Sequence, residues 1–452
     1  MYSEYIDNIE LLEESIRQYE DNLKCAADIH REMEEIEGLR QALYDKYHNK
    51  FQYINEEEVR EYSPQELDEI KRELLDNSFL TIIKRFLGIG KRQDIIYAEL
   101  MGKIKGLTLY LQGQMDEWQN QMENAYLGIQ TYGNNILEDY HKVMVSAGYE
   151  EASDWEKYEP SDKEENELYL GDIDVFLEEE RVHCEDLVAE TLGECYKDEF
   201  IKVPYTLESR KPFQMFCEYD GEQLRAAANG LARSLIYQQM RQMKEYAVEF
   251  HIIDGENTGN DLSELLGLKQ IRENEVWQLN KKVTGNVYKY AQIYLNNQDI
   301  SQGLKALDQY IGYVAEETSG FQSVEEYNAS PRCQEKGMIP LQMVVVQNFP
   351  SGFSENDVEL LNKLIRNGNQ RGVSVLILYD SKNRGFFKEK VDDPTANLLD
   401  GITLEAGNAH LMARDCSSAI ELRIMKEGKR EYVQSLIDEK MKVKETDNRF
   451  SA

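Results

Sequence analysis

Long hydrophobic runs are absent from this sequence. A membrane-spanning helix needs about 20 consecutive apolar residues, and no stretch of the chain approaches that length. The first ten residues, MYSEYIDNIE, contain acids and no apolar core, so they lack the pattern of a secretory signal. The six cysteines are scattered, and none forms a CxxC pair or lies near a histidine at metal-ligand spacing. These absences predict a reduced, cytoplasmic chain without a metal centre.

Basic residues are scarce as well. The 452 residues include 51 Lys and Arg against 85 Asp and Glu, which gives a formal net charge of −34. Such a surface repels phosphate, and the basic residues form no run, so the composition argues against direct nucleic-acid binding. The histidines do not cluster either. His251 lies within an apolar run and is expected to be a hydrogen-bonded core residue rather than a catalytic one.

The first third of the chain has the periodicity of long helices. Apolar residues recur at alternating spacings of three and four near the amino terminus, without a proline, which is the pattern of a coiled-coil seam. Ser63-Pro64 predicts the start of a second helix, and a third is expected from about 93 to 147. Long helices joined by a turn pack antiparallel, so residues 1–150 are predicted to form a coiled-coil hairpin. The seam of the first helix is expected at Ile9, Leu12, Ile16, Tyr19, Leu23, Ala26, His30 and Met33.

Residues 78–90, SFLTIIKRFLGIG, interrupt this acidic arm with an apolar and slightly basic segment. We interpret the segment as the corner of the hairpin. The alternative is a peripheral membrane contact, in which Lys84 and Arg85 would lie among apolar side chains at a lipid surface. The segment is short and its surroundings are acidic, which favours packing within the hairpin.

After the helices the sequence changes character. Residues 151–167 are acidic and poorly periodic and contain Pro160, which predicts a linker. From 168 to 440, strand-like runs alternate with helical patterns, which predicts an α/β domain with a mostly parallel sheet covered on both faces. Residues 441–452 form a polar tail. Strands are expected at 168–177, 199–208, 212–220, 247–255, 339–349 and 371–380, and the clearest helix at 223–246.

Ligands of such sheets bind at the carboxyl ends of the strands. Five residues of this sequence are expected at that edge: Gly221, Asp254, Gln347, Asn348 and Asp380. Asp254 could contact a ligand or a neighbouring subunit there. Its simpler role is to cap the loop GENTGND that begins beside it.

The order of these segments resembles the FtsK/SpoIIIE and HerA-type P-loop ATPases over residues 168–440. The resemblance rests on the strand HIIDG, on PTANLLDGITLEA, and on the strand-helix-strand unit VVQNFPSGFSENDVELLNKLIRNGNQRGVSVLI. The chain is similar in particular to the degenerate amino-terminal ATPase-like domain of certain bacterial FtsK-type proteins, in which a coiled coil comes first and an active motor follows. The resemblance implies a RecA-like fold and a bacterial cytoplasmic setting linked to DNA translocation, mobile elements or defence.

The groups that handle nucleotide in that family are missing at the matching positions. A Walker A loop needs G-x-x-x-x-G-K-[ST], whereas CEYDGEQLRAAANG keeps Gly221 and has no lysine, serine or threonine. Arg225 is the cation left in this segment. The Walker B position carries Gln347 and Asn348, neutral amides that cannot act as a base. GIGKR (88–92) follows no strand and is not interpreted as a P-loop. We therefore predict no catalytic residue, no metal, and neither ATP nor Mg²⁺ as a cofactor.

Two functions follow from this sequence. The first is a catalytically degenerate FtsK/SpoIIIE-like module that acts as a structural or interaction subunit of a larger bacterial ATPase assembly. It would dock on an active FtsK-type ATPase or on copies of itself, and its coiled-coil arm would bind a second protein. The alternative is a DNA-dependent ATPase with a non-standard nucleotide site that uses Asp254 or Arg225.

Overall fold

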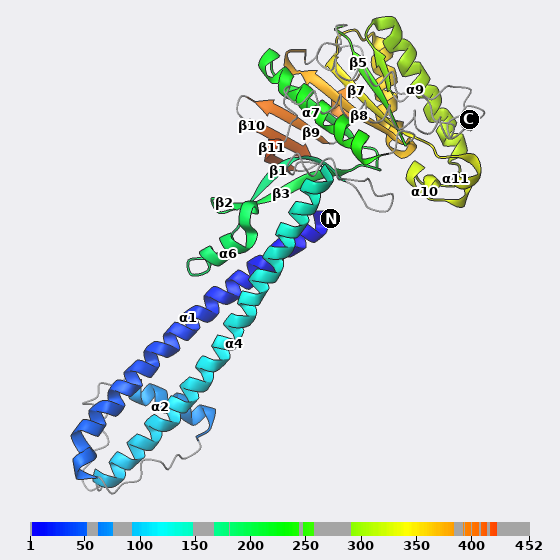
Figure 1. Cartoon of the computed structure of the whole chain (residues 1–452). Helices are drawn as coiled ribbons and strands as arrows, with labels where there is room; N and C mark the ends of the chain where they lie inside the picture. Colours follow the sequence, from blue (N-terminus) through cyan, green and yellow to red (C-terminus); the bar gives the residue numbers. More distant parts are fainter. Residues whose placement is uncertain are drawn as a thin grey trace, which may run out of the picture. The chain divides into compact units, whose positions relative to one another are not determined.

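The computed structural model describes residues 2–51, 62–75, 93–147, 167–179, 181–243, 247–256, 291–383, 392, 394–398, 400–405, 408–413 and 416–422. The expected hairpin corner (78–90), nearly all of the expected linker and the polar tail lie outside the described residues. The chain divides into two compact units (Figure 1), a helical unit (Met1–Glu138 with Phe176–Glu199) and an α/β unit (Asp139–Val175 with Phe200–Ala452). This division differs from the expected ranges, because each unit includes a segment that the sequence pattern assigned to the other.

The centre of the α/β unit is a parallel sheet. Its strands are β4 (Gln214–Tyr219), β5 (Val248–Asp254), β6 (Ala291–Tyr294), β7 (Leu341–Phe349), β8 (Val373–Asp380) and β9 (Asp400–Glu405). They lie in the order β9-β4-β8-β7-β5-β6, and each neighbouring pair is parallel. All nine residues of β7 are buried, as expected for a parallel strand between two helical layers. The prediction of a mostly parallel sheet in an α/β domain is confirmed.

The sheet continues beyond β9 with antiparallel strands. β10 (Asn408–Ala413) pairs with β9, β11 (Cys416–Leu422) pairs with β10, and β1 (Glu167–Phe176) pairs with β11. β3 (Phe200–Glu208) lies next to β1. β10 and β11 were not predicted, because Ser417 and Ser418 interrupt the apolar pattern of that segment.

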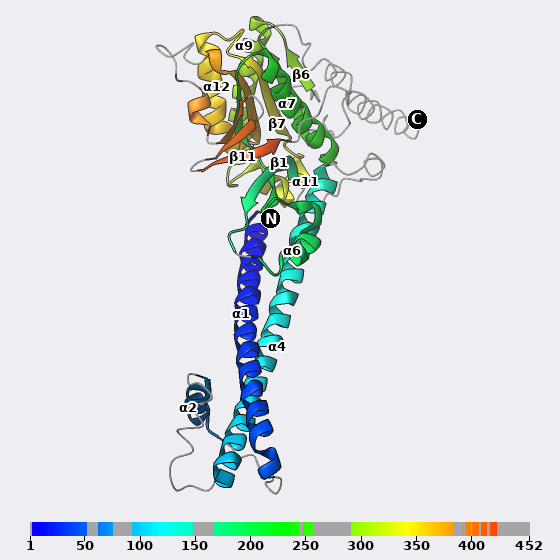
Figure 2. The same cartoon turned by 90° about the vertical axis from the view of Figure 1, so that its left-hand side faces the viewer.

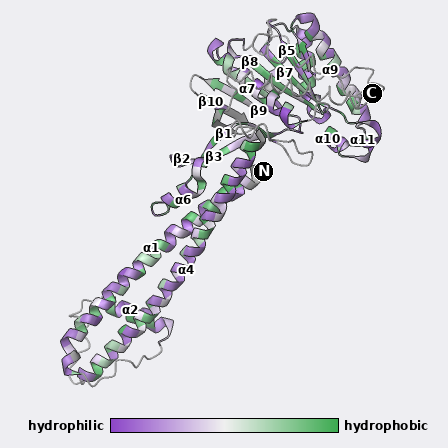
Figure 3. Ribbon diagram, viewed as in Figure 1, coloured by the Kyte–Doolittle hydropathy of each residue, from purple (hydrophilic) through white to green (hydrophobic). Residues whose placement is uncertain are grey.

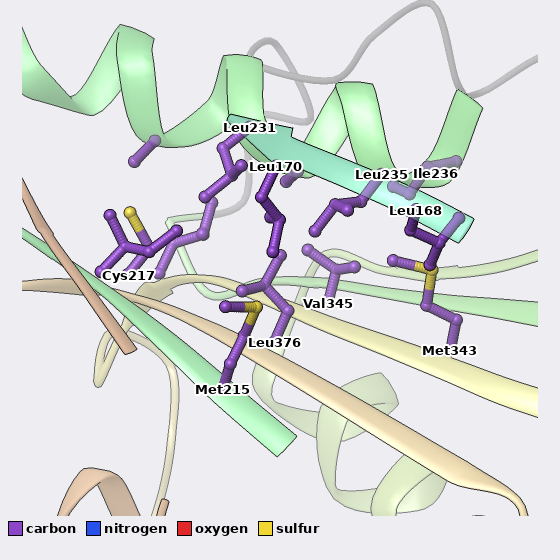
Figure 4. Close-up of a cluster of buried hydrophobic side chains, with 14 of the residues drawn as sticks. Leu168, Leu170, Met215, Cys217, Leu231, Leu235, Ile236, Met343, Val345 and Leu376 are labelled. Atoms are coloured by element: carbon purple, nitrogen blue, oxygen red, sulfur yellow. The ribbon is translucent and has the colours of Figure 1, made fainter. Parts of the chain in front are cut away.

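Helices cover both faces of the parallel strands. α7 (Glu222–Gln242) packs on one face, where its apolar side chains contact alternate residues of the strands (Figure 4). α9 (Asn297–Glu317) and α12 (Glu355–Gly368) pack on the opposite face. In β7, for example, Met343 lies in the cluster under α7, whereas Val344 lies in the cluster under α9 and α12. The shorter helices of the unit are α10 (Val324–Asn328), α11 (Pro331–Lys336), η4 (Asn369–Arg371), η5 (Ser381–Asn383) and η6 (Pro394–Asn397).

The helical unit is built on two long helices, α1 (Tyr2–Tyr47) and α4 (Gln93–Ala147), of which α4 has the predicted bounds. They lie side by side in both views (Figures 1 and 2). They are antiparallel, because Ser15 of α1 approaches Gly128 of α4 while Tyr47 lies against Tyr97, with ring centroids 6.0 Å apart. None of the helices in the described ranges combines the length and the apolar character that a membrane crossing requires.

Apolar and polar residues alternate along α1 and α4 (Figure 3), and most expected seam positions of α1 are at least half-buried. One position was wrong. Ile29 is buried, whereas the His30 side chain is 70% exposed and lies 3.4 Å from the Glu34 carboxylate. Isoleucine gains more from burial than imidazole, which would have to be desolvated. A third helix, α2 (Pro64–Leu75), packs its apolar residues Leu67, Ile70 and Leu74 in the same buried cluster as apolar residues of α1 and α4.

The segment that follows β1 packs on α1. It contains α6 (Glu185–Leu192), η2 (Gly193–Cys195) and β2 (Tyr196–Lys197). Glu13 and Glu20 lie two turns apart on one face of α1, and their carboxylates accept the backbone N–H groups of Glu178 (3.2 Å) and His183 (2.8 Å). The second oxygen of Glu20 lies 2.7 Å from His183 Nδ1. Glu20, which is buried, therefore holds the start of α6 on α1.

We predict that Glu20 makes this packing dependent on pH. Burial by itself raises the pKa of Glu20, but hydrogen bonds from the His183 ring, the His183 backbone and Cys184 outweigh burial and hold the pKa below its ordinary value of 4.5. A carboxyl group with a lower pKa in the folded state stabilises that state above the ordinary pKa, and the contribution is lost as the pH falls through the folded pKa. The free energy of unfolding of the wild type should therefore fall more steeply below about pH 4.5 than that of Glu20→Gln.

Urea unfolding followed by circular dichroism at a series of acidic pH values measures this difference. Glu14→Gln is the matched control, because the Glu14 side chain is 47% exposed and its hydrogen-bond partners, Arg17 and Gln18, lie on the same helix. If the free energy of unfolding fell equally steeply with falling pH in the wild type and in Glu20→Gln, the prediction would be contradicted.

Candidate functional site

The structure brings the predicted site positions to one edge of the sheet. In the paired strands Asp254 of β5 lies beside Gln347 of β7, and Asp380 of β8 lies beside Tyr219, the last residue of β4. Gly221 lies two residues after the end of β4 and is the N-cap of α7. The carboxyl ends of four parallel strands therefore surround the turn between β4 and α7, which is where α/β sheets bind ligands.

The turn at Gly221 has the backbone conformation that only glycine adopts freely. Its φ of 79° is in the left-handed region, and its carbonyl accepts the backbone N–H groups of Leu224 and Arg225, each at 3.2 Å. A Cβ placed on Gly221 would lie 2.9 Å from the ammonium of Lys382. The turn thus has a cation above it, although the sequence around Gly221 contains no lysine.

Lys382 lies at this edge and was not among the predicted site residues. Its ammonium lies 3.3 Å from the Asp220 carboxylate, and both side chains are about two-thirds exposed (66% and 68%). An ion pair this exposed contributes less than about 1 kcal/mol. Lys382 is far from Gly221 in sequence, and the signal that could have found it is the sheet order, since β8 lies beside β4.

Arg225, the other cation near the turn, is held by carboxylates. Its Nη1 lies 2.8 Å from Glu256 and 3.6 Å from Glu222, and the Arg225 side chain is largely buried. Burial raises the pKa of the nearby Tyr219 phenol far above its ordinary value, so Tyr219 adds no charge at neutral pH. Arg225 connects the first turn of α7 to the residues that follow β5.

Asp254 and the two amides form the interior of this edge. Asp254 is buried, and its Oδ1 accepts the backbone N–H of Glu256 (3.1 Å) and the side-chain amide of Asn348 (2.9 Å). The expected capping role of Asp254 is therefore present in the structure. Asn348 has a φ of 55°, which asparagine tolerates better than most residues. The side-chain amide of Gln347 instead points toward α7, where it donates to Asn229 Oδ1 at 2.8 Å.

The loops after β5 and β7 touch through their backbones. A Cβ on Gly255 would lie 1.5 Å from the carbonyl oxygen of Ser351, and a Cβ on Gly352 would lie 2.8 Å from the Gly255 Cα. Each loop therefore requires glycine at its point of contact. Together with the hydrogen bond from Asn348 to Asp254, this contact closes the edge between β5 and β7.

Other candidates from the sequence have structural partners. His251 is buried, with its ring nitrogens 2.6 Å from Gln342 Oε1 and 3.2 Å from the Tyr294 hydroxyl, as expected for a core histidine. Within the described ranges no three His, Cys, Asp or Glu side chains gather in a way that could hold a metal ion. Asp380 accepts the backbone N–H of Lys382 at 2.9 Å and so orders the segment that carries this lysine.

No family model matches the sequence, and no curated protein matches it. Solved structures show a low similarity to this chain, and the names of three of them describe two ATPases and a conjugation coupling protein. EssC (ATPases 2 and 3) from Geobacillus thermodenitrificans is 12% identical with a TM-score of 0.43, over 62% of this chain and 49% of EssC. The pCW3 conjugation coupling protein TcpA with ATPγS is 10% identical with a TM-score of 0.40, over 62% of this chain and 74% of TcpA.

A third neighbour is the cytoplasmic domain of the type VII secretion ATPase EccC of Thermomonospora curvata. It is 13% identical with a TM-score of 0.39, over 53% of this chain and 30% of EccC. The chain thus spans about half of the EssC structure and less of EccC.

We predict that Gly255→Ala strongly destabilises the α/β unit. The new Cβ would overlap the Ser351 carbonyl, and backbone atoms cannot rotate away, so the free energy of unfolding should fall by at least about 2 kcal/mol. Gly312→Ala is the matched control, because Gly312 lies within α9 with no atom within 4 Å of its Cβ position. That change should stabilise the protein by about 0.5–1 kcal/mol. Urea unfolding measures both, and equal stability of the two variants would contradict the prediction.

Proposed function

We propose that this chain is a catalytically degenerate FtsK/SpoIIIE-like module that acts as a structural or interaction subunit of a larger bacterial ATPase assembly. The observation that carries the proposal is the buried pairing of Asn348 with Asp254 and of Gln347 with Asn229. In an active P-loop ATPase the end of the corresponding strand would present carboxylates to the metal and to the attacking water. Here the two amides are already bonded to side chains of the same domain.

The residues around Gly221 do not fit magnesium triphosphate. Binding would place several negative charges between Asp220 and Glu222. Lys382 and Arg225, the cations near the turn among the residues that the structure describes, are each paired with a carboxylate of this chain. A nucleotide would have to displace those carboxylates, and the acid at the end of β5, Asp254, is buried and bonded to Asn348. For this reason the proposal includes no step that uses ATP.

The partner we propose for the α/β unit is an active FtsK-type ATPase or a second copy of this chain. We propose that α1 and α4 form an intramolecular coiled coil, in line with their antiparallel packing and the heptad spacing of their buried residues, and that this arm binds a second protein. The formal charge of −34 supports a protein partner over nucleic acid, and it favours a cytoplasmic protein over one held at an anionic membrane.

The alternative function is a DNA-dependent ATPase with a non-standard nucleotide site. One observation favours it, namely that Lys382 supplies a cation above the Gly221 turn from another strand, in a weak and exposed pair. If Lys382 replaced the missing Walker lysine, the chain could bind phosphate without the usual motif. Asp254 would then be the acid available to a metal, although it is buried and bonded to Asn348.

Nucleotide binding and turnover separate the two functions. We predict that the full chain binds no Mg-ATP by isothermal titration calorimetry and hydrolyses none, with or without double-stranded DNA, because its cations and amides are engaged internally. Turnover that is abolished by Asp254→Asn or by Arg225→Ala would overturn the proposal and establish the alternative. Lys305→Ala is a control for these changes, since Lys305 is an exposed residue of α9.

A further inference from the structure

A buried carboxylate joins the end of α4 to β1. The last turns of α4, from Asp139 onward, belong to the α/β unit. There the hydroxyl of Tyr140 donates to Asp172 Oδ2 at 3.2 Å, and the hydroxyl of Tyr169 donates to Asp172 Oδ1 at 2.5 Å. All three side chains are buried. A carboxylate accepts on both oxygens, so Asp172 can bind two hydroxyl donors at once and thereby compensate for its own desolvation.

The backbone of Tyr169 is bound in turn by a side chain of α7. Its N–H donates to Gln238 Oε1 at 2.8 Å, and its carbonyl accepts from Gln238 Nε2 at 2.9 Å. One glutamine amide therefore occupies both hydrogen-bonding groups of a strand residue, as a neighbouring strand would. One turn further along α7, Gln242 donates to the carbonyl of Glu167 at 2.8 Å.

β1 and α7 also make apolar contacts. Leu168 and Leu170, on either side of Tyr169, lie beside Leu231, Leu235 and Ile236 of α7 (Figure 4). The carboxyl-terminal part of α7, from Ala228 to Gln242, is buried at every residue, which is unusual for a helix with so many polar side chains. The bonds to β1 satisfy both ends of the Gln238 amide and the NH2 group of Gln242.

We propose that Tyr140, Asp172, Tyr169 and Gln238 form a relay that couples the end of α4 to α7. α7 begins at Gly221, so the relay leads from the helix that enters the α/β unit to the helix that forms the turn at the strand ends. A displacement of the last turns of α4 is then transmitted to β1 and α7 through buried hydrogen bonds rather than absorbed between them. Asp172 is a positioning residue in this device, and the inference holds whether or not the turn binds a nucleotide.

Hydrogen exchange on the full chain tests the relay. Tyr140→Phe removes only the hydroxyl that connects α4 to Asp172. We expect it to speed amide exchange on the order of tenfold in β1 and α7 as well as at the end of α4. Exchange in α12, on the opposite face of the sheet, should stay at the wild-type rate. Tyr126→Phe is the matched control, since it removes a half-exposed hydroxyl of the same helix that contacts only Gln130 among the hydrogen bonds described.

Asp172→Asn provides a second variant with nearly the same shape. Its amide keeps one acceptor oxygen and replaces the other with a donor, so it should speed exchange in β1 and α7 in the same pattern. Faster exchange confined to α4 in Tyr140→Phe would overturn the relay, and so would a uniform increase that includes α12. Wild-type exchange in α7 of both variants would overturn it as well.

Discussion

The hydrogen bond from Asn348 to Asp254 is the constraint on which the carboxyl edge of the sheet depends. It joins the last residues of two neighbouring strands in a buried position, where an unsatisfied carboxyl group or amide would be strongly unfavourable. Once this bond is made, the chains leave β5 and β7 in fixed directions. They then meet at Gly255 and Gly352, where a Cβ on either residue would overlap the backbone of the other loop. The polar groups of the edge are thus occupied by one another.

The same bond underlies the proposed absence of catalysis at this edge. With Asn348 directed to Asp254, its neighbour Gln347 faces the other side of the strand and bonds to Asn229 of α7. α7, β7 and β5 are therefore linked through the side-chain amides of Asn229, Gln347 and Asn348 and the carboxyl group of Asp254. Such a network favours a rigid edge, in keeping with the proposed docking role. Proton transfer and metal binding need acids or bases with access to a ligand, and Asp254 has neither exposure nor an acidic neighbour on β7.

The sequence predicted the parts of the fold that rest on uninterrupted periodicity. α4 has the expected bounds, and β7 and β8 were expected because apolar runs of that length between turn residues are typical of buried parallel strands. Local capping was also predictable, as in the role of Asp254. The exposure of His30 was not predictable. Either Ile29 or His30 could occupy the buried position, and the choice depends on packing against the other helices.

Contacts that depend on distant segments could not be read from the sequence. Lys382 lies above Gly221 only because β8 lies beside β4, and one sequence does not give the strand order. By sequence alone, Glu13 and Glu20 would be assigned to a solvated acidic face of the helix. Their backbone partners, Glu178 and His183, are more than 160 residues away in the sequence. The burial of Asp172 likewise could not be predicted from the sequence of β1, because it depends on the hydroxyl of Tyr140 in a distant helix.

A crystal structure of the full chain grown with excess Mg²⁺ and a non-hydrolysable ATP analogue tests the central claim most directly. We predict that no analogue is bound at the Gly221 turn and that the pairs Asn348–Asp254 and Gln347–Asn229 are intact. An analogue seated against that turn, with its metal on a carboxylate of this chain, would contradict the account.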